Sequence, residues 1–198
     1  MALKPFTVHD LAEAVLGCVC ASLDAVAEDI PGQPGCPCRA CVVPGTVAWD
    51  GCGPDDCGDG EPGQLTVSVS RIYPVSQTTF PTEDRSVQGV RGCTPPQLTA
   101  VELVVTLLRC APIQDEGGCP PTCEEQTEAS RILHVDATTV YSALSCCLPG
   151  IGPNPRRPRR YVIGQQRIIG PQGGCVGLEQ RVTVALPGCG PCPGDDAS

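Results

Sequence analysis

Histidine, aromatic residues and basic residues are all scarce in this sequence. It contains two histidines in 198 residues, and only 3% of its residues are aromatic. Lysine and arginine number 13 against 22 aspartates and glutamates, which gives a formal net charge of −9. An acidic chain is poorly suited to neutralising phosphates, although a local basic patch could still contact DNA. We therefore do not expect the protein to bind nucleic acid in a sequence-specific way.

Long apolar runs are also lacking. The first ten residues contain no apolar segment with a cleavage site, and the later apolar stretches are too short to cross a bilayer. These features predict synthesis and folding in the cytosol, without a membrane partner.

Cysteine, by contrast, is abundant, with 16 residues placed mostly in connections rich in proline and glycine. Because disulfides are uncommon in a reducing cytosol, such a set indicates metal binding, buried thiols, or a protein that later enters an oxidising environment. A zinc site here would need almost only cysteine ligands, since histidine is so rare. A zinc ribbon has two separated C-x2-C knuckles, and here no C-x2-C pair lies near a second one. The residues that could form such an alternative zinc cluster are Cys36, Cys38, Cys41, Cys52 and Cys57.

Hydrophobic periodicity predicts two helices and several strands. Thr7 can cap an amphipathic helix that Pro31 ends, and Thr122 with Glu125 forms a capping box for a second one. The second helix is expected to place Ala129, Ile132, Leu133, Val140, Tyr141 and Leu144 along one apolar stripe. Strands are predicted over residues 64–73, with strict alternation, and over 98–110, 161–169 and 178–186, with short extended pieces at 41–43 and 46–49.

This order of elements predicts an α+β fold. We expect a mainly antiparallel sheet with both helices on one face, joined by long loops rich in cysteine, proline and glycine. The segment 98–110 is apolar on both faces, so it belongs in the middle of the sheet. Residues 1–186 should form a single domain, and residues 187–198 a flexible polar tail.

Catalytic motifs are not evident. His9 and His134 have no neighbouring nucleophile motif, and neither a phosphate-binding loop nor a dinucleotide fingerprint is present. Cys189 and Cys192 have redox spacing but no following helix to stabilise a thiolate, so a structural disulfide or a mobile thiol pair fits better. We expect a protein that is not an enzyme and has no cofactor.

One dense basic cluster lies at residues 156–160. It is either a solvated loop or a contact to DNA or to the acidic face of a neighbouring subunit. Trp49 and Tyr73 are further interface candidates if exposed, because aromatic residues and arginine often anchor interfaces, but burial in the core is an equally good interpretation. The candidate interface residues are Arg156, Arg157, Arg159, Arg160, Trp49 and Tyr73.

Five segments together resemble one known family. The segments are 43–52 (VPGTVAWDGC), 63–74 (GQLTVSVSRIYP, followed by Phe80-Pro81), 108–112 (LRCAP), Cys146-Cys147 and 170–177 (GPQGGCVG). They are similar to the tail terminator, or head-to-tail joining, proteins of long-tailed actinobacteriophages, and the resemblance covers most of residues 7–186.

The resemblance implies a structural virion protein at the head–tail junction, assembled in the host cytoplasm. Six copies would form a homohexameric ring that caps the tail tube, stops its growth and joins it to the head connector or stopper protein. DNA would pass through the lumen without sequence-specific binding, which suits an acidic wall. The alternatives are another neck or head-completion protein, or a cysteine-rich zinc-binding module. The loops 31–63 and 111–122 exceed what such a fold needs.

Overall fold

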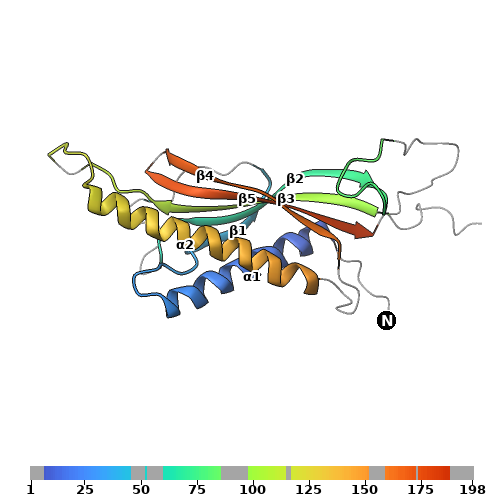
Figure 1. Cartoon of the computed structure of the whole chain (residues 1–198), viewed down its shortest axis with the longest axis horizontal. Helices are drawn as coiled ribbons and strands as arrows, with labels where there is room; N and C mark the ends of the chain where they lie inside the picture. Colours follow the sequence, from blue (N-terminus) through green and yellow to red (C-terminus); the bar gives the residue numbers. More distant parts are fainter. Residues whose placement is uncertain are drawn as a thin grey trace, which may run out of the picture.

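The computed structural model describes residues 7–45, 52, 60–85, 98–114, 117–151, 159–172 and 174–187. Two helices lie along one face of a five-stranded sheet, as Figure 1 shows, so the predicted α+β fold is confirmed. The elements are α1 (Val8–Asp29), β1 (Arg39–Val43), β2 (Gln64–Val75), β3 (Leu98–Cys110), α2 (Cys123–Cys147), the 3-10 turn η1 (Leu148–Gly150), β4 (Tyr161–Gln172) and β5 (Cys175–Pro187).

The sheet has the strand order β1-β2-β3-β5-β4. Only β1 and β2 are parallel, and the other neighbours are antiparallel. β3 is the central strand, as its two apolar faces predict. The predicted closing hairpin is β4 and β5, and β4 forms one edge of the described sheet.

Thr7 and Thr122 cap the two helices, as predicted, and Thr122 forms the predicted capping box with Glu125. The structure adds a second capping box, between Thr7 and Asp10. α1 buries Leu11, Val15, Val19 and Leu23, whose four-residue spacing keeps them on one side of the helix.

The prediction that Tyr141 belongs to the apolar stripe of α2 was wrong, because its side chain is exposed, with a relative accessibility of 52%. Val140 is fully buried, and a neighbouring residue on a helix points about 100° away from it. The position one turn before Val140 on the buried face is filled by Asp136, a charged residue that is fully buried.

β2 departs from the strict alternation expected of it. A bulge between Val69 and Arg71 inserts one extra residue relative to β3. Such an insertion reverses the side to which all later residues point. Tyr73 and Val75 therefore pack with Ala100 in a second small cluster, separate from the core under the helices.

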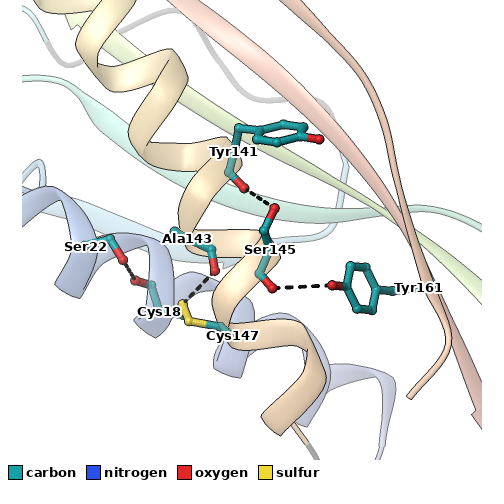
Figure 2. Close-up of a disulfide and its surroundings, with 7 residues drawn as sticks. All are labelled: Cys18, Ser22, Tyr141, Ala143, Ser145, Cys147 and Tyr161. Carbon is teal, nitrogen blue, oxygen red and sulfur yellow. Dashed lines mark hydrogen bonds between the residues drawn. A yellow bond between two sulfur atoms is a disulfide. The ribbon is translucent and has the colours of Figure 1, made fainter. Parts of the chain in front are cut away.

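Disulfides connect the helices and loops. Figure 2 shows Cys18 of α1 joined to Cys147 at the end of α2, with a Cα–Cα distance of 6.4 Å. Close by, the hydroxyl of Tyr161 on β4 donates to the carbonyl of Ser145, 3.3 Å away. The end of α2 is thus attached both to α1 and to the edge strand. In the described part of the chain, neither helix is long and apolar enough to span a bilayer.

Candidate functional site

Most of the cysteines proposed for the alternative zinc cluster form disulfides. Cys36 is bonded to Cys20 and Cys52 to Cys110, while Cys38 is also disulfide-bonded. A sulfur in a disulfide is not a thiolate and does not serve as a zinc ligand. The described residues include no group of three or more side chains able to hold a metal ion. The proposed cluster was therefore wrong as a set. Its other two members are Cys41, which is exposed, and Cys57, which lies outside the described residues.

The described part of the basic cluster lies just beyond the C-terminal end of α2. Arg159 donates from Nε to the carbonyl of Ile151 at 2.9 Å, and Arg160 donates to the carbonyl of Gln77. Partial burial lowers the pKa of Arg159, but an arginine stays protonated at neutral pH. Arg156 and Arg157 lie outside the described residues.

Tyr73 belongs to the core and not to the exposed surface. It is 8% exposed, and its hydroxyl donates to the carbonyl of Pro81 at 2.8 Å. The guanidinium of Arg71 covers its ring, 4.7 Å from the centroid. Tyr73 was an interface candidate only if its side chain was exposed, and it is not. The alternative interpretation, burial in the core, is confirmed. Trp49 lies outside the described residues.

A groove of about 1200 Å³ lies at the N-terminal end of α2. Its walls come from residues 32–34, 61–62 and 109–112 and from the first turns of α2. The lining is mostly apolar and contains Pro34, Pro62, Ala111, Pro112, Ala129, Ile132 and Val176. Described residues of the two long loops for which the sequence suggested no role thus contribute to the walls of this groove.

Four glutamates also line the groove: Glu61, Glu124, Glu125 and Glu128. Glu128 is paired with Arg131 at 2.7 Å, and this hydrogen bond lowers the pKa of Glu128. Glu125 accepts from the backbone of Thr122 as part of the capping box. Within the described ranges, Glu61 and Glu124 have no cationic partner. The groove is therefore apolar at its walls and negatively charged.

Among the described residues that line the groove, the one basic side chain is already neutralised. Arg109 is 5% exposed and forms two hydrogen bonds with Asp136, at 2.8 and 3.1 Å. Its Nη1 also donates to the carbonyl of Gly35 at 2.8 Å, which holds the loop after α1 against β3. Gln33 donates to Asp136 at 2.9 Å, and its own Oε1 has no partner among the described residues.

Parts of four of the segments that resemble the phage family lie at one end of the sheet, around the C-terminal end of β3: Cys52, Gly63, residues 108–112 and residues 174–177. Gly63, with a φ of +113°, approaches Leu108 so closely that a Cβ would lie 2.3 Å from the Leu108 oxygen. Residue 52 is attached to Cys110 by the disulfide, and the amide of Ala111 donates to the carbonyl of Gly174 at 2.8 Å. These segments are far apart in the sequence, so their meeting is a tertiary feature. These parts surround the end of β3 that forms one wall of the groove, whereas Pro74 pairs with Thr99 at the opposite end of β3 and residues 46–51 lie outside the described residues.

β4 offers a second surface. It has no partner strand on its outer side in the described sheet, and it exposes Val162 by 40% and Ile168 by 49%. An unpaired edge strand with exposed apolar residues is a template for association with another chain. The two histidines, in contrast, are exposed on different helices, and His9 pairs with Glu13 at 3.2 Å.

Sequence reasoning missed the groove and the ion pair in its wall. The glutamates come from segments about 60 residues apart, so no local pattern joins them. A signal for the ion pair was present: Asp136 occupies a buried position of the α2 periodicity, and a buried carboxylate requires a cationic partner.

Comparison of the sequence with protein-family models and with curated proteins found no match. The functional argument therefore depends on the surfaces described above and on the residues of the resemblance.

Proposed function

We propose that this protein is a ring-forming tail terminator, a structural component of a phage particle. In this role it caps the tail tube, stops its elongation and joins the tail to the head connector. It acts through the shape of its surfaces, and no step of its function is catalytic.

The observation that carries the proposal is that Cys52, Gly63, residues 108–112 and residues 174–177, which belong to four of the resembling segments, lie together at one end of the sheet. They contribute glycines in close backbone contacts, a disulfide and a cross-strand turn. These features support a structural role for the segments, because they shape the backbone and offer no nucleophile paired with a base. The open edge of β4 adds a surface for assembly.

We expect the purified chain to form a closed ring, alone or on addition of the tail tube protein. Native mass spectrometry and negative-stain electron microscopy measure the mass and the shape of the assembled species. Particles that lack this chain should have tails of uncontrolled length without attached heads. A strict monomer under all conditions, with tail tube present, contradicts the proposal.

The closest alternative is another neck component, such as a head-completion protein. Reconstruction of the whole particle separates the two, because a tail terminator contacts the tail tube and a head-completion protein contacts the portal side. The zinc-module alternative loses its support through the disulfides of Cys36 and Cys52.

A further inference from the structure

Two groups of opposite charge are associated with the two ends of α2. The groove with its four glutamates lies at the N-terminal end of α2, and the basic cluster 156–160 follows α2 and η1 in the sequence. Of this cluster, the structure describes Arg159 and Arg160, and Arg159 is hydrogen-bonded to Ile151 just beyond η1. We infer that the basic cluster of one copy docks into the acidic groove of the next copy. This inference depends on the proposed ring and names the contact that closes it.

One chain cannot make this contact with itself. Glu128 precedes Leu148 by 20 residues of helix and turn, a distance of about 30 Å at 1.5 Å per residue. The seven residues 152–158 connect Ile151 to Arg159, which are hydrogen-bonded to each other at the far end of α2. A chain of seven residues that leaves and returns to one place reaches about 13 Å at most. The groove of the same copy is therefore out of range.

The chemistry of the two surfaces is complementary. The groove offers the carboxylates of Glu61 and Glu124, which lack cationic partners in the described part of the chain, and apolar walls rich in proline. The basic segment supplies Arg156 and Arg157 to this contact, because Arg159 and Arg160 donate to backbone carbonyls of their own chain. Arginine side chains form strong hydrogen bonds with carboxylates, and their stems pack on apolar surfaces.

The geometry of such a contact favours a ring. A surface at one end of the molecule that binds a different surface at the other end forms a heterologous interface. Repetition of a heterologous interface gives a closed ring or an open filament, depending on the rotation between copies. A twofold dimer, which would pair identical patches, is not expected from these two surfaces.

The test is a charge-swap series on the full chain. Glu61→Arg with Glu124→Arg reverses the groove, and Arg156→Glu with Arg157→Glu reverses the basic segment. Glu13→Arg with Glu28→Arg is the matched control, because it changes the same number of charges on exposed positions of α1 that do not line the groove. Circular dichroism and the thermal midpoint establish that each variant is folded, and sedimentation velocity measures assembly.

We expect either reversal to raise the concentration for half-assembly at least about tenfold, with no change in the control. The fourfold variant with both reversals should recover assembly, which a purely local loss of stability would not. If the wild-type chain forms rings and the groove reversal leaves them intact, this inference is overturned while the proposed function stands. The same holds if the reversals weaken only binding to the tail tube protein, since the groove then holds a different partner. A wild-type chain that never self-associates overturns both.

Discussion

At the scale of single residues, the ion pair of Arg109 and Asp136 is the most demanding feature of the protein. Both side chains are almost completely buried, and together they connect β3, α2 and the loop after α1. Removing one partner of a buried pair leaves an uncompensated charge in a medium of low polarity, which costs far more than the pair contributes as a whole.

We expect Asp136→Ala to lower the free energy of unfolding by about 3–5 kcal/mol, measured by urea denaturation. The double variant Arg109→Met with Asp136→Leu should recover most of this loss, because it leaves no charge unpaired. Glu128→Ala, which removes an exposed pair with Arg131, serves as the control and should change stability little. Equal effects of Asp136→Ala and Glu128→Ala would contradict this account.

Residues of this kind also mark the limit of prediction from the sequence. Thr7, Thr122 and the strand 98–110 were predicted correctly because their signals are local and repeat with the period of the element. Tyr73 was ambiguous, since its exposure depends on the bulge in β2 and on the segment that ends at Pro81. The groove was not predictable, because its glutamates become neighbours only when distant loops fold together.

At the scale of secondary-structure elements, the disulfide between Cys18 and Cys147 fixes α1 against the end of α2. The two cysteines are separated by 129 residues, so the bond restricts a large part of the unfolded chain. In the chain-entropy account, such a long closed loop gives a large stabilisation.

The variant with Cys18→Ala and Cys147→Ala should lose about 2–4 kcal/mol of unfolding free energy under oxidising conditions. Cys146→Ala provides a matched control, because Cys146 is an exposed free cysteine next to the bonded one. Its stability, measured in guanidinium chloride, should equal that of the wild type. If both variants unfold at the same denaturant concentration, the disulfide does not contribute as described.

At the scale of the whole molecule, the cysteines distinguish a disulfide-stabilised protein from a metal-binding module. The Cys20–Cys36 disulfide holds the loop after α1, and the Cys52–Cys110 disulfide attaches residue 52 to the end of β3 beside the groove. Formation of these bonds makes the oxidised protein more stable than the reduced one.

We expect dithiothreitol to lower the thermal midpoint of the oxidised protein and EDTA to leave it unchanged. Reduction releases the restraints on the unfolded chain, whereas chelation acts only where a metal contributes to folding. Differential scanning calorimetry under both conditions measures the effect. The opposite result, in which EDTA lowers the thermal midpoint and dithiothreitol does not, would support a cysteine-rich zinc-binding module instead.

The sequence by itself determined the element order, the helix caps, the central position of β3 and the α+β class. Each of these depends on periodicity or on residues within a few positions of one another, where local sterics and hydrogen bonding decide the outcome. Only the tertiary structure decided which cysteines pair and on which face of the sheet Tyr73 is buried. It also decided that residues of two loops and of α2 line one acidic groove. Those features depend on contacts between residues far apart in the chain, whose distances are set by packing and not by local sequence.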